Sequence, residues 1–189
     1  MNTPAHLIVG TAVFSRPAYR GTYLAALAGA MAPDLSLYVM VAVSIWGLGV
    51  PARTVFNEYY YTDAWQQVFA VDNSFILWGL FFAVALWRGM PRLIAFAGAG
   101  LLHIALDFPL HTHDARMHFW PVTDWVFISP VSYWDMQAHA GVVGPMEFGL
   151  SLGCVILLWR RFKDVAIRSA TLVFMAMEAM STGIWRFIF

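Results

Sequence analysis

Residues 93–108 read Leu93-Ile-Ala-Phe-Ala-Gly-Ala-Gly-Leu-Leu-His103-Ile-Ala-Leu-Asp107-Phe108, an apolar run whose only titratable side chains are His103 and Asp107. A helix of about 20 mainly apolar residues is long enough to cross the hydrocarbon core of a bilayer. Four further apolar runs of comparable length lie near residues 21–46, 70–87, 143–159 and 168–187. The sequence therefore predicts five membrane-spanning helices.

The amino-acid composition also indicates a membrane environment. Hydrophobic residues make up 60% of the chain and charged residues only 12%, whereas an ordinary soluble domain has about a quarter charged residues. The formal net charge is zero, so no overall field attracts nucleic acid, and we expect membrane lipids rather than nucleic acid as partners. The single Cys154 has no intrachain partner for a disulfide.

The remaining segments complete the predicted architecture. A short apolar stretch, residues 6–14, follows Thr3-Pro4, a pattern typical of a helix start, and is too short to span a bilayer. The connections 50–69 and 109–142 are polar or aromatic, and the second is long enough to cover the membrane face. No internal repeat is visible. We predict an all-α, polytopic transmembrane helix bundle in a single domain, residues 1–189, with a short N-terminal helix and a long extracytoplasmic connection.

Basic residues gather in three turns, which the positive-inside rule places on the cytoplasmic side. They are Arg16 and Arg20, Arg88 and Arg92, and Arg160, Arg161, Lys163 and Arg168. The connections 50–69 and 109–142 are then expected on the periplasmic side, although each contains one arginine that counts against this orientation, Arg53 and Arg116.

Potential metal ligands are concentrated at the end of the 93–108 run. His103 and Asp107 are four residues apart, which places both on one face of a helix. Phe108-Pro109 is expected to end this helix, because proline disfavours the helical conformation of the residue before it. The chain then continues with further candidate ligands or proton carriers, His111, His113, Asp114 and His118. Imidazole and carboxylate are ligands of zinc, so we predict a divalent metal site, with zinc favoured and manganese second. The alternative is a polar connection at the level of the lipid headgroups.

Two residues far away in the sequence are expected to join this site. Asp34 lies within the first predicted span, where an ionised carboxylate costs about 2.5 to 3.5 kcal/mol unless a partner answers it. His6 reaches the same depth if the short first helix runs inward from the outer face. The alternatives are that Asp34 caps a helix behind Pro33 and that His6 is solvated.

Two further acids are secondary candidates. Asp72, in Asp72-Asn73-Ser74, is a possible metal ligand or a helix cap at the start of the second span. Glu147 follows Gly144-Pro145 and is either a general base or an acid that interacts with the helix dipole.

Taken together, His6, Pro33-Asp34, His103-x3-Asp107 and Trp120-Pro121 resemble the membrane-bound metal-dependent hydrolases, the YdjM-like group of inner-membrane proteins described as LexA-regulated. The resemblance implies a metallohydrolase of the bacterial inner membrane and gives no defined substrate. The chain departs from the group in one respect. The group has a histidine-containing segment between the Pro-Asp and His-x3-Asp motifs, whereas this chain has no histidine between His6 and His103. Either an acid such as Asp72 replaces that ligand, or the number of metal ions differs, or activity has been lost.

The function predicted from these residues is metal-assisted hydrolysis. His6, Asp34, His103 and Asp107, with Asp72 as a possible addition, would hold one or two divalent ions, and His111, His113, His118 and Glu147 would serve as extra ligands or acid–base groups. The depth of the site indicates a lipid or lipid-linked substrate, such as a phosphoester, that enters from the outer leaflet. The rival interpretation is a non-enzymatic membrane protein, either a metal or proton transporter that uses Asp34 and Glu178 or a structural subunit of an assembly.

Overall fold

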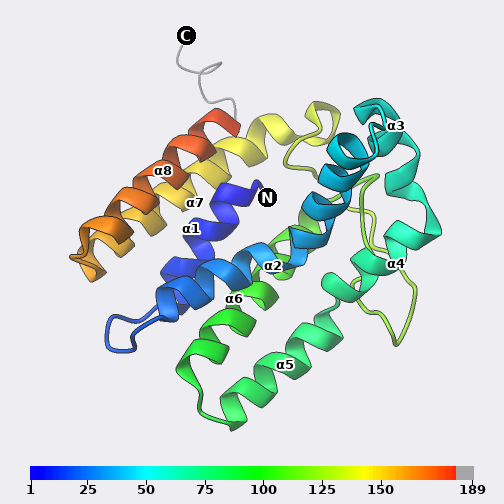
Figure 1. The fold of residues 1–189 in the computed structure, drawn as a ribbon. Coiled ribbons are helices and arrows are strands. Elements are labelled where there is room, and N and C mark those ends of the chain that lie inside the picture. The colour runs from blue at the N-terminus through cyan, green and yellow to red at the C-terminus, as the bar shows by residue number, and fades with distance from the viewer. Residues whose placement is uncertain (182–189) are drawn as a thin grey trace.

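A computed structural model describes residues 1–181, and all regular secondary structure in that range is helical. The predicted all-α class is therefore confirmed (Figure 1). The α-helices are α1 (Thr3–Phe14), α2 (Thr22–Ala42), α3 (Ala52–Asn57), α4 (Asp63–Asp72), α5 (Phe75–Trp87), α6 (Pro91–Asp107), α7 (Ala140–Arg161) and α8 (Val165–Ser181). A π-helical turn, Val43–Gly47, prolongs α2, and short 3-10 turns follow at Tyr59–Tyr61, Phe108–Leu110 and Met136–Ala138.

Four helical segments of residues 1–181 are long and apolar enough to cross a membrane, one fewer than predicted. They are Thr22–Gly47, Asp63–Trp87, Pro91–Leu110 and Ala140–Arg161. The fifth predicted span, 168–187, corresponds to α8, which has 17 described residues, and the rest of it lies outside the described range. The predicted span 70–87 begins earlier, at Asp63, because most of the connection 50–69 is helical (α3 and α4) rather than irregular.

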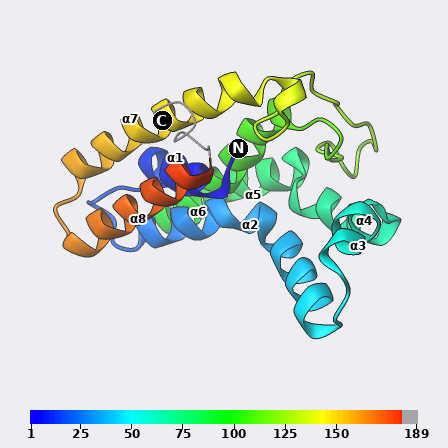
Figure 2. The same cartoon turned by 90° about the horizontal axis from the view of Figure 1, so that it is seen from above.

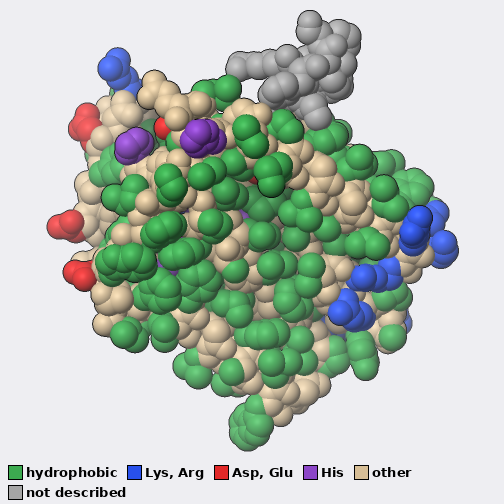
Figure 3. Space-filling view, turned by 180° about the vertical axis from the view of Figure 1, so that it is seen from behind, with side chains coloured by type: hydrophobic (Ala, Val, Ile, Leu, Met, Phe, Trp, Pro, Cys, Tyr) green, Lys and Arg blue, Asp and Glu red, His purple; other side chains and the backbone are tan. Residues whose placement is uncertain are grey.

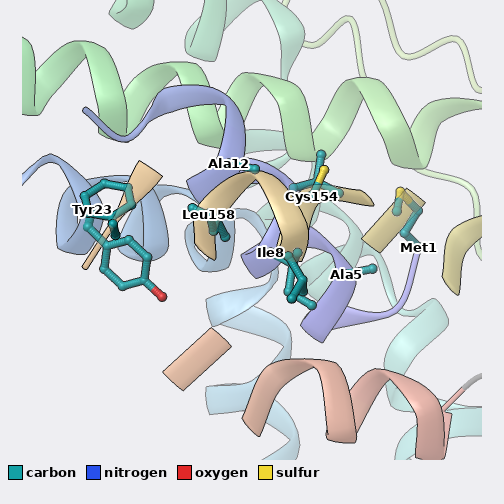
Figure 4. Close-up of a cluster of buried hydrophobic side chains, with 10 residues drawn as sticks. Met1, Ala5, Ile8, Ala12, Tyr23, Cys154 and Leu158 are labelled. Carbon is teal, nitrogen blue, oxygen red and sulfur yellow. The ribbon is translucent and has the colours of Figure 1, made fainter. Parts of the chain in front are cut away.

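The short helix α1 lies at the centre of the molecule. It packs against α2, α6, α7 and α8 (Figures 1 and 2). Nine of its twelve residues, from Pro4 to Ala12, are buried. Ile8, Leu158 and Tyr23 belong to the apolar cluster that surrounds it (Figure 4). The predicted short N-terminal helix is confirmed, but Thr3 lies inside the helix rather than at its cap, and Asn2 precedes it. A central α1 carries His6 into the middle of the bundle.

The close packing of α2 on α6 depends on Gly29. A Cβ atom at this position would lie 2.0 Å from the carbonyl oxygen of Phe96 on α6, so no other residue fits without a shift of the backbone. Small residues allow helices to approach in this way. The approach brings the carbonyl group of Ala30 to the side chain of His103.

The three basic turns lie at the same end of the molecule. The Arg92 side chain donates to the carbonyl oxygen of Arg20 at 3.0 Å, and that of Arg161 donates to the carbonyl oxygen of Ser15 at 3.0 Å. In the face shown in Figure 3, most Lys and Arg side chains gather at one side, and Asp, Glu and His side chains gather at the opposite side, with hydrophobic side chains between them. The charges are thus separated along the bundle, as the sequence indicated.

The long connection between α6 and α7 is irregular from His111 to Asp135 but well anchored. The backbone N–H of Phe75 donates to the carbonyl oxygen of His118 at 2.8 Å, and that of Ser129 donates to the carbonyl oxygen of His111 at 3.0 Å. Ser74, rather than Asp72, caps α5, since its hydroxyl accepts from the backbone N–H of Leu77 at 3.1 Å. These contacts fold the connection back over the ends of α2, α4 and α6.

Candidate metal centre

His6, His103 and Asp107 form one buried cluster. His6 comes from α1, and the other two residues lie one helical turn apart near the end of α6. The Nε2 atom of His6 lies 2.8 Å from Oδ1 of Asp107, and Nε2 of His103 lies 3.2 Å from Oδ2 of the same carboxylate. One nitrogen or oxygen atom from each residue lies within 4.8 Å of the others, so these three side chains could hold a metal ion. The amino group of Met1 also contacts Oδ1 of Asp107.

The position of the proton on His103 favours a cation at its other nitrogen. Nδ1 lies 2.6 Å from the carbonyl oxygen of Ala30, which can only accept, so Nδ1 carries the hydrogen. If the ring carries no second hydrogen, Nε2 is a lone pair; this atom is buried and has no hydrogen-bond partner among the described residues. It faces carboxylate oxygens of Asp107 and Asp34 at 3.2 and 3.6 Å. A lone pair directed at two carboxylates is unfavourable unless a cation lies between them, and a histidine held by a backbone carbonyl at one nitrogen is the usual form of a metal ligand.

Asp34 joins the cluster from α2 through a second set of contacts. Its Oδ2 atom faces His103, and its Oδ1 accepts from Nη1 of Arg116 at 3.2 Å. The same Nη1 donates to Oδ1 of Asn73 at 2.8 Å, and Nδ2 of Asn73 donates to the carbonyl oxygen of Pro33 at 3.3 Å. The charge of the buried Asp34 carboxylate is therefore neutralised by a buried arginine, Arg116. Asn73 links this ion pair to the break between α4 and α5. Burial alone would lower the pKa of Arg116, but the charge of Asp34 outweighs it and raises this pKa, so the guanidinium stays charged.

His111 extends the cluster toward the cavity. Its Nε2 atom lies 3.3 Å from Oδ2 of Asp107, and its Nδ1 lies 2.8 Å from Oδ2 of Asp114. Burial alone would lower the pKa of His111, but the carboxylates of Asp107 and Asp114 outweigh this effect and raise it above its usual value. In turn, burial would raise the pKa of Asp114, but its hydrogen bond with His111 lowers it. The raised pKa favours the protonated form of His111 beside the cluster.

A cavity of about 430 Å³ opens beside these residues. Asp107, His111 and Arg116 line it, with Asp34, Asp114 and Tyr133 around them. Burial and the charge of Asp107 raise the pKa of Tyr133, so its hydroxyl is neutral at physiological pH and is able to donate. His6 and His103 lie behind this wall and are almost completely buried, at 1% exposure each. The cavity thus gives a small polar group access to the carboxylate side of the cluster.

The structure brings four of the five predicted metal ligands together, His6, Asp34, His103 and Asp107, and leaves Asp72 apart. The side chain of Asp72 does not line the cavity, and its carbonyl oxygen accepts from Nε1 of Trp78 at 2.6 Å. The neighbouring Asn73 is the residue of this segment whose side chain contacts Arg116 and the carbonyl oxygen of Pro33.

The four predicted acid–base residues have different surroundings. His111 contacts the cluster, as described above, whereas His113 is exposed. His118 is buried, with Nδ1 at 2.9 Å from the carbonyl oxygen of Arg116 and its ring against Phe75 and Phe108. Burial lowers the pKa of His118 to about 4, which keeps it neutral. Glu147 is buried on α7, where its Oε1 accepts from the backbone N–H of Asn2 at 2.5 Å. Neither His118 nor Glu147 lines the cavity at the cluster.

Sequence reasoning did not identify Arg116 and Asn73 as parts of the site. Arg116 was counted only as a charge in the outer connection, and Asn73 only as a neighbour of Asp72. Their roles depend on a contact between α2, the break after α4 and the long connection between α6 and α7. The spacing of residues within any one of these segments does not predict such a contact.

No family model matches the chain, and comparisons with curated proteins and with solved structures find no significant match. The class of protein is described by its fold and its site. Over residues 1–181 the protein is all-helical, with four helical segments long and apolar enough to span a membrane and with a buried His-His-Asp cluster that could hold a metal ion.

Proposed function

We propose that this protein is a membrane-embedded, metal-dependent hydrolase that cleaves a lipid or lipid-linked substrate, with a phosphoester as the bond class. The observation that supports it most is the bare Nε2 of His103, fixed by the Ala30 carbonyl and directed at Asp34 and Asp107. A site of this kind needs a cation, and histidine with carboxylate favours zinc, with manganese as the second choice.

The residues have distinct parts in this proposal. His6, His103 and Asp107 would hold the ion, and Asp34 would add a carboxylate oxygen from α2 as a fourth ligand. A bound divalent ion polarises the scissile group and makes water a stronger acid. His111 lies at the cavity wall between Asp107 and Asp114, where it accepts or returns a proton. Arg116, which Asp34 and Asn73 hold in place, brings a guanidinium to the wall of a cavity also lined by carboxylates and is the proposed donor to an anionic substrate group.

The surroundings of the cavity support the proposal of a lipid substrate. The cluster lies at the C-terminal end of α6 and beside the middle of α2, and both helices belong to segments able to span a membrane. Large hydrophobic side chains such as Leu35 and Val39 on α2 are 51% and 53% exposed, as expected for a surface that faces lipid. In this proposal the basic turns face the cytoplasm and the cavity faces the periplasm of a bacterial inner membrane, the orientation that the positive-inside rule favours for charges separated in this way.

The test is metal content together with turnover. Protein purified in detergent is loaded with zinc or manganese, freed of excess metal and quantified, and is then given phosphatidic acid and a water-soluble phosphomonoester. We expect about one ion per chain or more, and release of phosphate that stops with a chelator. His103→Ala and Asp107→Ala should lose both, whereas His113→Ala, which changes an exposed histidine of the same connection, should keep both. Equal metal content in all four proteins would exclude the proposed site. Metal that is held without hydrolysis of either phosphoester would exclude the proposed reaction.

A further inference from the structure

A second cavity lies on the other side of the end of α6. It has a volume of about 760 Å³ and is lined mainly by apolar side chains of α6, the turn after it and α7, among them Leu106, Leu110, Val142, Val143, Met146 and Leu150. Sites for apolar small molecules have volumes of about 300 to 1,000 Å³ and linings of this kind. Glu147 is the acidic residue of this lining, and it is 4% exposed, with Oε1 engaged by Asn2. We call this cavity the α6–α7 groove.

Only a thin wall separates the groove from the cavity of the metal centre. Leu106 faces the groove and Asp107 the metal cavity, and the same division holds for Leu110 and His111. Met1, which lies between α6 and α7, lines both (Figure 2). A molecule with an apolar arm in the groove therefore has its polar end within one residue of the metal cluster.

The groove is open along a helix able to span a membrane. Val142, Met146 and Leu150 are four residues apart on α7, so they form one stripe, and they are 61%, 69% and 45% exposed. This stripe continues onto other exposed apolar residues of α7, such as Ile156 and Leu157. The surface around the groove is thus the surface that a bilayer covers, and acyl chains are the apolar molecules that it meets.

We propose that the α6–α7 groove binds one acyl chain of a membrane phospholipid and presents the polar end of that lipid to the metal cavity. The inference deepens the proposed function, since it assigns the substrate class as a lipid bound tail first. Binding of the acyl chain itself requires no metal, because none of the four proposed ligands, His6, Asp34, His103 and Asp107, lines the groove.

The experiment uses the full chain in nanodiscs that contain a small fraction of phosphatidylcholine with a photoactivatable diazirine near the end of one acyl chain. After irradiation, the labelled residues are located by mass spectrometry of peptides. We expect residues 106–110 and 142–150 to be labelled at least threefold more than the exposed apolar faces of α5 and α8, with and without chelator.

Matched tryptophan variants test the position. Leu150→Trp fills the groove, whereas Leu152→Trp changes a leucine of equal exposure, 44% against 45%, that does not line it. Labelling of the groove should fall at least threefold in Leu150→Trp and stay unchanged in Leu152→Trp. Met146→Trp serves as a second groove variant if Leu150→Trp lowers the melting temperature.

Two results would overturn the proposal. The first is uniform labelling of all exposed helices. The second is a groove that the probe does not label in nanodiscs shown by native mass spectrometry to contain two copies of the protein, because a second copy would then cover the groove. The two proposals fail separately. Strong labelling of the groove in a protein that binds no metal would support the acyl-chain site and exclude the metal-dependent hydrolase. Hydrolysis of a phosphoester without labelling of the groove would support the hydrolase and exclude the acyl-chain site.

Discussion

The ring of His6 stacks on the ring of His103, with centroids 3.7 Å apart and planes inclined by 14°. The stack joins α1 to α6 and holds both imidazoles in one orientation beside Asp107. Ligands that are already fixed lose little freedom when they take up an ion. The stack is one of the contacts that hold α1, a helix too short to span a bilayer, at the centre of the bundle.

The stack allows the ligand role of His6 to be separated from its packing role. His6→Phe keeps an aromatic ring on His103 but removes both nitrogens, so we expect the affinity for zinc to fall by more than about 100-fold, beyond the loss typical of residues that only orient a ligand. The measurement is a competition titration against a chromophoric chelator in detergent. His113→Phe is the control, and a similar affinity in both variants would show that His6 is not a ligand.

Gly29 is predicted to be indispensable for the approach of α2 to α6. In Gly29→Ala the new Cβ meets the carbonyl group of Phe96, a backbone atom that cannot swing away, so the helices must separate. We expect a loss of about 1 to 3 kcal/mol in the free energy of unfolding, together with weaker zinc binding, because the Ala30 carbonyl moves from His103. Thermal unfolding in detergent and the zinc titration measure the two effects.

Gly149→Ala provides the comparison for this variant. No atom lies within 4 Å of the added Cβ on α7, so the change should be neutral or should stabilise by up to about 1 kcal/mol. Equal melting temperatures for the two variants would contradict the packing argument.

Arg116 is predicted to stabilise the metal-free protein through Asp34. Arg116→Met leaves a buried carboxylate without its guanidinium, so we expect a loss of about 3 to 5 kcal/mol when the protein is unfolded in the presence of a chelator. The double variant Asp34→Asn/Arg116→Met should recover much of this loss, since it removes both charges. Additive effects of the two substitutions would show that the pair is not coupled.

The parts of the site that lie close in the sequence were predictable. His103 and Asp107 are four residues apart, and Phe108-Pro109 follows directly, so helical geometry alone predicts a shared face at a helix end, and α6 ends at Asp107 as expected. Asp34 was recognised because a carboxylate in an apolar run demands a partner. The nature of that partner was not recognisable, because Arg116 lies 82 positions further along the chain.

Other predictions were wrong because a local pattern has more than one solution in three dimensions. The segment Asp72-Asn73-Ser74 does interrupt a helix, but Ser74 caps α5 and Asn73 faces the arginine, and the direction of a side chain at such a break depends on what packs there. The polar and aromatic residues of 50–69 predict a connection but not its structure, and this connection forms short helices that cover the long connection, for example where the hydroxyl of Tyr60 donates to the carbonyl oxygen of Asp114 at 3.3 Å.

His118 gives a prediction that depends on pH. Its pKa falls from an ordinary 6.5 to about 4 because the ring is buried, here between Phe75 and Phe108, so the unfolded chain takes up a proton between these values and the folded protein does not. The stability that neutral His118 contributes is therefore complete above pH 6.5 and is lost as the pH falls toward 4, by about 3 kcal/mol in all. His118→Phe keeps the ring packing and cannot titrate, so its melting temperature should fall less than that of the wild-type protein between pH 7 and pH 4.5. Both proteins are measured with a chelator, which removes the pH dependence of metal binding. His113→Phe, which changes an exposed histidine, should follow the wild-type curve, and parallel curves for His118→Phe and the wild-type protein would show that His118 is free to take up a proton in the folded state.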